Sequence, residues 1–223
     1  KTIQKKYVIN FALLLFISPV LAVILGTHHV VNHGISTVAI ASLFGFWFLT
    51  GIGITVGYHR LFSHRSFKAS PFVRFVLLIL GGSAWQNSAI KWCSDHRNHH
   101  RYVDTERDPY NAKKGFWWSH FMWIITVSDR KLDNVPDLWK DSMIRWQHKY
   151  YYTITTIFNV GMPLLVGVLF GDIAGVMIFG CLVRVVLVHH TTFCINSFAH
   201  IFGSQRWSEA NTSRDNWFLS LFT

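Results

Sequence analysis

The chain has 223 residues, of which 51% are hydrophobic and 16% aromatic, and its mean hydropathy is +0.27. This composition is too apolar for an ordinary soluble domain and is typical of a single-domain membrane protein. The formal net charge is +10, but the basic residues do not gather in a nucleic-acid-binding motif, so we expect no nucleic-acid partner. The odd number of cysteines, three, and the absence of a CxxC spacing argue against a disulfide framework.

Four apolar segments, at residues 7–26, 35–57, 151–171 and 173–193, are long enough to be transmembrane helices. About 20 helical residues at a rise of about 1.5 Å cross the apolar core of a bilayer. The first segment has no small-residue cleavage site after it, so we interpret it as a retained span. The apolar run at 71–90 contains Arg74, Gln86 and Asn87 and begins with proline, which favours an interfacial or buried helix.

The distribution of basic residues predicts the orientation. Three lysines lie in residues 1–6 and 15 lysines or arginines in residues 58–150, whereas the loops 27–34 and 171–173 have none. The positive-inside rule then places both termini and residues 58–150 in the cytoplasm. We therefore predict an all-α, multi-pass integral membrane protein with two helical hairpins. A helical cytosolic cap, residues 58–150 and 194–223, would complete a single domain spanning residues 1–223.

Histidines gather beside the predicted spans in three groups: His59 and His64; His96, His99 and His100; and His200, which follows Asn196 by four residues. The second group is spaced i, i+3, i+4 and shares one helical face, as do Asn196 and His200. His59 and His64, spaced i, i+5, would diverge by about 140° on an ideal α-helix, so they would hold a site from its flanks or at a frayed helix end.

Neutral imidazole is a common ligand for iron, copper and zinc, so these groups predict a metal centre facing a lipid-like substrate. Six interfacial histidines that merely extend toward water are the weaker alternative. The remaining histidines are less informative. We expect His28, His29 and His33 in a loop on the opposite side and structural roles for His120 and His148. His189 and His190 could either support the metal ligands or be simple interfacial residues.

The chain resembles the membrane-bound fatty-acid desaturases of the acyl-CoA (delta-9) type, and the similarity extends over essentially its whole length. The matching segments are His59-Arg-Leu-Phe-Ser-His64, Gln86-Asn87 with Trp92, Asp95-His96-Arg-Asn-His99-His100, Asp104-Thr105-Glu-Arg-Asp108-Pro109-Tyr-Asn111, Gly115-Phe-Trp-Trp-Ser119-His120 and Asn196-Ser-Phe-Ala-His200. Histidine motifs with this spacing, in this order between four spans, are a specific signal.

The resemblance implies an enzyme with two iron ions that uses O2 as a co-substrate to insert a cis double bond into a saturated acyl chain. His59, His64, His96, His99, His100 and His200 match iron ligands, and Asn196 matches a residue that reaches one iron through a water. Imidazole ligands can hold two irons and leave positions open for oxygen. Asp95 and Asp104 could orient ligand rings, or could simply pair with nearby arginines.

The resemblance also implies an acyl tunnel lined by Gln86, Trp92, Thr192 and Phe193, although each aromatic residue could equally be ordinary core. Animal enzymes hold the coenzyme A head group with basic residues at two places where this chain has Ser94 and the pair at 127–128. The substrate could therefore be an acyl-CoA, an acyl-lipid or an acyl carrier protein. Arg184, inside the fourth span, is expected to be paired and structural.

The family carries a third histidine motif after a segment resembling Arg214-Asp215-Asn216-Trp217, whereas this sequence ends at Thr223. We therefore expect the chain to be C-terminally incomplete and to lack three ligands, so that as a fragment it would not hold both irons normally.

No haem or flavin motif is present, so we expect a separate electron donor such as a ferredoxin or cytochrome b5 on the basic surface, which would also face membrane lipid. A related di-iron lipid hydroxylase and a non-catalytic metal-binding or transport protein are the alternatives. A transporter should place ionisable ligands at mid-membrane, where only Arg184 is charged.

Overall fold

The structure is a computed structural model that describes residues 2–126, 131–205 and 210–221, with the side chains of the first helix described from residue 15 onward. Four helical segments are long and apolar enough to cross a membrane: Leu15–His33, Thr37–Ser63, Tyr151–Phe170 and Ile173–His200. In these described ranges the chain forms helices and one isolated antiparallel bridge, Ser204 with Asp215, but no strand. The predicted all-α fold with four spans is confirmed.

The spans consist of consecutive helical elements with the following bounds: α1 (Thr2–His33); α2 (Thr37–Ile52) with η1 (Gly53–Ser63); α8 (Tyr151–Thr156) with η4 (Ile157–Gly161) and α9 (Met162–Phe170); and α10 (Ile173–Val176) with η5 (Met177–Val183), α11 (Arg184–Ser197) and η6 (Phe198–His200). The helices outside the spans, here called the cap, are α3 (Pro71–Ser83), α4 (Ala89–Tyr102), η2 (Ala112–Lys114), η3 (Trp118–Met122), α5 (Trp123–Thr126), α6 (Pro136–Lys140), α7 (Ser142–Lys149) and α12 (Trp217–Ser220).

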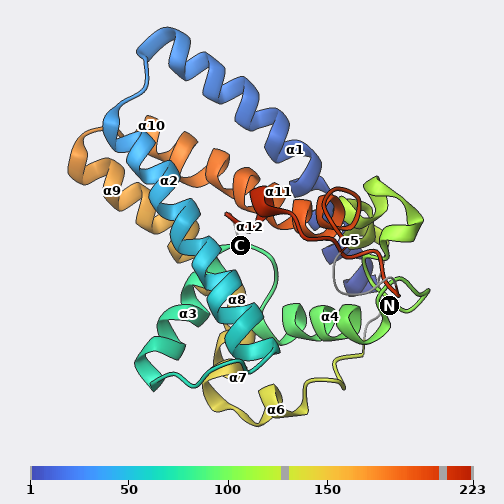
Figure 1. Cartoon of the computed structure of the whole chain (residues 1–223). Coiled ribbons are helices and arrows are strands. Elements are labelled where there is room, and N and C mark those ends of the chain that lie inside the picture. The colour runs from blue at the N-terminus through green and yellow to red at the C-terminus, as the bar shows by residue number, and fades with distance from the viewer. Residues whose placement is uncertain (1, 127–130, 206–209, 222–223) are drawn as a thin grey trace.

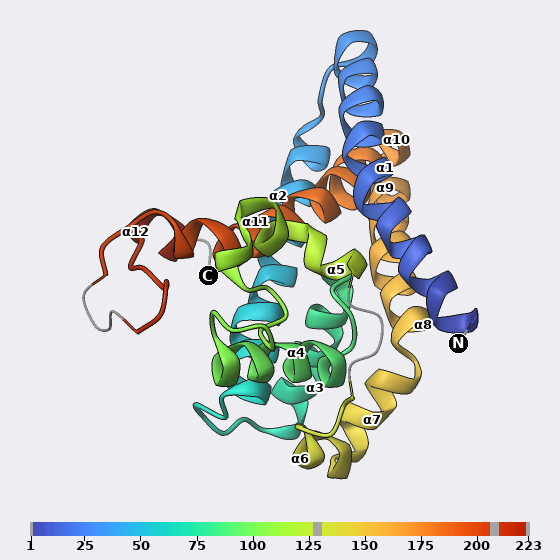
Figure 2. The same cartoon turned by 90° about the vertical axis from the view of Figure 1, so that its right-hand side faces the viewer.

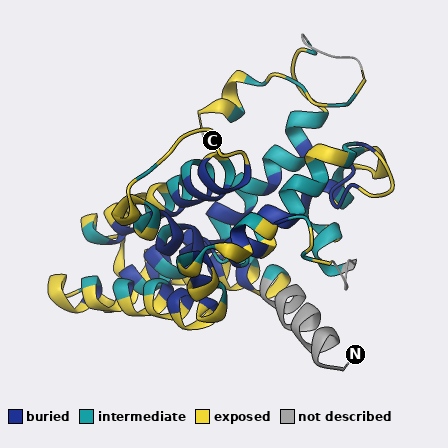
Figure 3. Ribbon diagram, turned by 90° about the horizontal axis from the view of Figure 1, so that it is seen from below, coloured by how far each residue is buried: buried dark blue, intermediate teal, exposed yellow. Residues whose placement is uncertain are grey.

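The fourth span is the centre of the bundle because it packs against each of the other three (Figure 1). The spans extend above the cap helices α3, α4, α6 and α7 in Figure 2. Large apolar side chains on the outer faces of the spans are exposed, for example Val23, Phe48 and Leu169, and Figure 3 shows exposed residues around a buried interior. An exposed apolar surface of this kind fits a lipid environment.

The helices exceed the expected spans at three places. The fourth span continues from the expected end at residue 193 to His200, so residues 194–200 are part of the span and not of the cap. The first helix continues to His33, so His28, His29 and His33 lie on a helix and the loop is reduced to residues 34–36. There Ser36 caps α2 by accepting a hydrogen bond from the backbone N of Ala39 (3.1 Å) and also donates to the carboxylate of Asp172. The second span continues through His59 to Ser63, so its last turns are part of the first histidine motif.

Arg184 is 1% exposed and joins the fourth span to its neighbours, as its position in an apolar span requires. Its guanidinium donates to the carbonyls of Ser83 (3.0 Å) and Gly180 (3.3 Å) and to the side-chain oxygen of Asn159. Asn159 in turn donates to the carbonyl of Thr155 (2.8 Å). The arginine therefore connects the third span, the fourth span and α3 through neutral acceptors.

The second span and α3 approach each other through two glycines. A Cβ added at Gly53 would lie 2.2 Å from the backbone N of Gly81, far inside van der Waals contact. The same approach places Tyr58 against Gly81, and the Tyr58 hydroxyl accepts a hydrogen bond from Gln147 (2.6 Å). The close packing of these two backbones sets the position of η1, and therefore of His59, relative to α3.

We expect Gly53→Ala to destabilise the protein by about 1–3 kcal/mol, because the new methyl group forces two backbones apart. Thermal unfolding of the purified protein measures the effect. The matched control is Gly45→Ala in the same span, where an added Cβ meets nothing within 4 Å. Equal melting temperatures for the two variants would contradict the close packing.

Candidate metal centre

His59 and His64 lie on the same face of their helix, contrary to the predicted divergence. Residues Gly53–Ser63 form a π-helix, in which the hydrogen bonds run from residue i+5 back to residue i. The bond from the backbone N of His64 to the carbonyl of His59 (3.0 Å) completes this pattern, and the two ring centroids are 4.6 Å apart. The wider turn of a π-helix places residues i and i+5 on the same face, whereas the same residues diverge on an α-helix.

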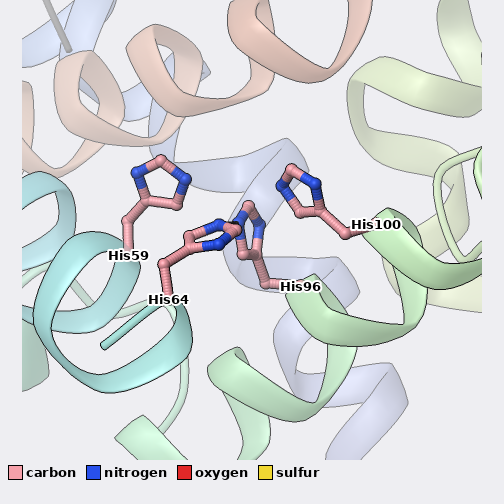
Figure 4. Close-up of side chains that lie close together, drawn as sticks. All are labelled: His59, His64, His96 and His100. Carbon is pink, nitrogen blue, oxygen red and sulfur yellow. Dashed lines mark hydrogen bonds between the residues drawn. The ribbon is translucent and has the colours of Figure 1, made fainter. Parts of the chain in front are cut away.

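Two histidines of α4 face this pair, and the four side chains converge from η1 and α4 (Figure 4). The Nε2 atoms of His64 and His96 are 2.9 Å apart, and the ring centroid of His100 lies 4.6 Å from that of His64. One nitrogen from each of His59, His64, His96 and His100 lies within 4.8 Å of the others. These four residues are called the histidine cluster below.

Arg97, which follows His96 on α4, fixes the positions of η1 and α4 relative to each other. Its guanidinium donates to the carbonyls of Phe62 (2.8 Å) and Ser63 (3.1 Å) at the end of η1. It also forms a bidentate pair with Asp137 at 2.7 and 2.9 Å. Burial alone would raise the pKa of Asp137, but the hydrogen bonds from Arg97 and Arg65 outweigh it and hold that pKa well below its ordinary value. The carboxylate is therefore charged, as a stable pair requires.

The electrostatic environment keeps the cluster neutral. Burial, and next the neighbouring histidines, lower the pKa of His96 well below 6.5 and that of His100 to about 4. Burial, and next Arg97, also lower the pKa of His64. Imidazoles that are neutral at pH 7 have a free lone pair, so the donor set fits a first-row metal ion.

The spacing of the cluster also fits one ion. Metal–nitrogen distances of about 2.1 Å place opposite ligand nitrogens about 4.2 Å apart. The ligand nitrogens of the four histidines lie within 4.8 Å of one another, so only small side-chain movements would bring them to the spacing around one ion. His64 and His100 are exposed, whereas His59 and His96 are half-buried, so the cluster opens toward solvent on one side.

His99 is not one of the four histidines of the cluster, and its ring lies between the cluster and His200, with ring centroids 5.5 Å from His100 and 5.6 Å from His200. Its Nδ1 bonds to the buried carboxylate of Asp108 (2.9 Å), which leaves Nε2 available. The Nδ1 of His200 bonds to the Thr212 hydroxyl (2.8 Å), and that hydroxyl donates to Asp104 (2.8 Å). Because both rings are oriented through their Nδ1 atoms, this second group resembles a metal half-site with supporting carboxylates.

The sequence did not indicate that Asp108 supports His99. The two residues are nine positions apart, and their contact depends on the turn that follows α4. Asp104 acts on His200 indirectly, through Thr212, and Asp95 is half-buried on α4. Asn196 is half-buried on α11, one helical turn before His200.

Three of the four residues expected to contact an acyl chain are joined by hydrogen bonds. The Gln86 amide donates to the Thr192 hydroxyl (2.8 Å), and its carbonyl oxygen accepts from the Trp92 indole (3.3 Å). The Trp92 ring stacks on His96 with centroids 4.9 Å apart, so this group adjoins the cluster. Gln86 lies between two residues with a left-handed backbone, Trp85 (φ 58) and Asn87 (φ 79).

His189 supports that unusual turn, since its Nε2 lies 3.1 Å from the carbonyls of both Ala84 and Trp85. His189 therefore supports the candidate acyl site from within the bundle. Ser94 is buried and donates to the side chain of Asn134 (2.6 Å), and residues 127–128 lie outside the described residues.

Phe193, the fourth expected acyl contact, is buried among three imidazoles. Its ring centroid lies 5.6 Å from His120, 5.7 Å from His189 and 5.8 Å from His190. The Nε2 of His120 lies 3.1 Å from the Nδ1 of His190, and the Nδ1 of His120 lies 2.9 Å from the Ser197 hydroxyl. No sequence pattern indicated this His120–His190 pair, because 70 residues separate its members.

The spans and histidines define a membrane protein with a candidate metal centre at one end of its helical bundle. The fatty acid desaturase family model matches residues 34–223, and the chain belongs to this family. It is 41% identical over 78% of its length to the probable acyl-CoA desaturase of Schizosaccharomyces pombe and 40% identical over 78% to acyl-CoA desaturase 1 of Saccharomyces cerevisiae. The matches cover 37% and 35% of those two proteins. The chain is also 34% identical to the sn-1 stearoyl-lipid 9-desaturase of Anabaena variabilis, over 85% of the chain and 68% of that protein.

The pKa of His120 gives a pH prediction. Burial, and next His190, lower this pKa from 6.5 to about 4. As the pH falls from 6.5 toward 4, the unfolded chain takes up a proton at this residue and the folded chain does not, so stability declines. We expect His120→Gln to reduce the loss of melting temperature between pH 7 and pH 4.5. The exposed-residue control His28→Gln should follow the wild type, and an H120Q profile parallel to wild type would refute the assignment.

Asp108→Asn should weaken metal binding at the His99–His200 group by about 10–100-fold, because the ring loses its charged partner. Titration of the metal-free protein with Fe²⁺ under anaerobic conditions measures this change. Glu106→Gln is the matched control, since the Glu106 carboxylate is 84% exposed and pairs only with Lys114 among the contacts described. Unchanged affinity in D108N would show that Asp108 does not support a ligand.

Proposed function

We propose that this protein is an O2-dependent di-iron desaturase that inserts a cis double bond, at the delta-9 position, into a saturated acyl chain carried as acyl-CoA or acyl-lipid. The observation that carries the proposal is the convergence of four neutral histidines beside the Gln86–Trp92–Thr192 group. Membership of the fatty acid desaturase family supports the reaction class. The names of the relatives, acyl-CoA desaturases and a stearoyl-lipid 9-desaturase, support the substrate class and position.

One iron would be held by the histidine cluster. The second would be held by His99 and His200, with Asn196 reaching it through a water. The bound irons would supply the activation of O2 that removal of hydrogen from an unactivated methylene requires. The protein contributes neutral ligands at fixed positions, and Asp108 and the Asp104–Thr212 pair hold two of the rings in the required tautomer.

The acyl chain would lie along Trp92, because this indole separates Gln86 from the His96 ring. The hydrogen bonds of Gln86 to Trp92 and Thr192 satisfy the polar groups of this wall, which leaves apolar surface for the substrate. Phe193 would form a further part of the slot and is fixed by its three imidazole neighbours.

The histidine cluster and both chain termini would face the cytoplasm, as the basic residues of segment 58–150 favour. Desaturation reduces O2 to water with two electrons from outside the substrate, so a donor must dock near the cluster. The exposed residues Arg60 and Arg101, which follow the cluster members His59 and His100 in the chain, suit an acidic donor such as a ferredoxin or cytochrome b5.

The test is fatty-acid profiling of desaturase-deficient yeast that expresses the natural protein containing this chain. We expect new monounsaturated acyl chains, and the double-bond position gives the regiochemistry. His96→Ala should reduce the product to background and lower the iron content, whereas His28→Ala, on the far end of the first span, should change neither. Hydroxylated acyl chains would instead establish a hydroxylase, and an unchanged profile with normal iron content would refute both activities.

A further inference from the structure

A shallow, open groove of about 480 Å³ lies on α6 and α7, away from the histidine cluster. Its lining includes three aromatic residues, Trp139, Trp146 and Tyr150, and two cations, Arg145 and Lys149. The three aromatic residues are between 36% and 42% exposed, so the groove presents ring surface as well as charge. Neither the metal ligands nor the acyl-contact residues line it.

The groove is positively charged, and the nearby carboxylate of Asp141 does not neutralise it because it has other partners. Asp141, which precedes α7, pairs with Arg74 and caps the helix by accepting from the backbone N of Met143 (3.0 Å). Arg145 donates one hydrogen bond, to the carbonyl of Trp139 (2.6 Å), which orients the guanidinium without neutralising it. The Nζ atom of Lys149 lies 5.0 Å from the centroid of the Tyr150 ring. Both cations are therefore placed beside aromatic surface and can bind an anion.

The position of the groove identifies the source of that anion. α7 leads through Tyr150 directly into the third span, which begins at Tyr151, so the groove lies where a span leaves the apolar core. Aromatic surface continues onto α3, because the Phe75 and Trp146 rings are 5.7 Å apart and Phe72 is 74% exposed. Tryptophan and tyrosine prefer this depth of a bilayer, and adjacent cations attract anionic head groups.

We propose that the α6–α7 groove binds the phosphate of an anionic phospholipid, with Arg145 and Lys149 as its partners and the aromatic residues against the glycerol and upper acyl region. The site would select phosphatidylglycerol over phosphatidylcholine, because the choline cation cancels the attraction of the phosphate. The proposal rests on membrane embedding and is independent of the reaction at the irons.

Thermal unfolding of the full chain in detergent, with dioleoylphosphatidylglycerol or dioleoylphosphatidylcholine added at equal concentration, tests the site. A lipid that binds the folded protein raises the melting temperature. We expect the larger rise with phosphatidylglycerol, and Arg145→Gln/Lys149→Gln should lose at least about half of it. The matched control, Arg107→Gln/Lys113→Gln, removes two exposed cap cations and should keep the full rise. An equal rise with both lipids, or a full rise in the R145Q/K149Q variant, would overturn the proposal.

Native mass spectrometry with added coenzyme A distinguishes the lipid from a soluble phosphate source. Phosphatidylglycerol should remain bound to the wild type when coenzyme A is present and should be depleted from R145Q/K149Q. Displacement by coenzyme A would assign the groove to soluble phosphates and refute the lipid site. Both variants should remain in the membrane after carbonate extraction, so loss of lipid selectivity is separable from loss of insertion.

Discussion

The arrangement of the candidate metal centre depends on the side chain of Arg97. This guanidinium lies between the two histidine-bearing helices, donates to the last carbonyls of η1 and pairs with Asp137. The carbonyls at the end of a helix have no partners within it and carry partial negative charge, so a cation there is stabilising. Because Arg97 is next to His96, the same contact that closes the end of η1 also sets the position of α4. The distance between the histidine motifs is thus determined by one charge-assisted network.

Four imidazoles in contact cannot all be protonated, because the charged rings would repel one another. Burial and the proximity of the rings both disfavour protonation, so the pKa values of His96 and His100 are lowered and the rings remain neutral at pH 7. Each neutral ring has one N–H donor and one nitrogen with a free lone pair, and the Nε2 atoms of His64 and His96 lie within hydrogen-bond distance of each other. A cation at the centre would satisfy all four, so stability and metal binding are coupled here.

The membrane explains why the site lies at the end of the bundle. Within the spans, polar groups are acceptable only where partners are supplied, and Arg184 illustrates this with acceptors on three elements. A metal site requires room and a route by which the ion can enter, which the apolar core does not provide. The site therefore begins where η1 leaves the apolar region, and the Gln86–Trp92–Thr192 group lies between the polar cluster and the apolar bundle.

The four spans and the histidine groups could be predicted from the sequence, because hydrophobic length and residue spacing are local properties. The sequence also placed Gln86, Trp92 and Thr192 together through a family resemblance. It could not reveal that His59 and His64 share a face, because spacing implies an α-helix until the π-helical hydrogen bonds are known. It likewise could not show that His99 lies outside the cluster and beside His200, or bring His120 to His190 and Asp108 to His99. Those pairings depend on how elements that are far apart in the chain pack against one another, so they become visible only in the folded structure.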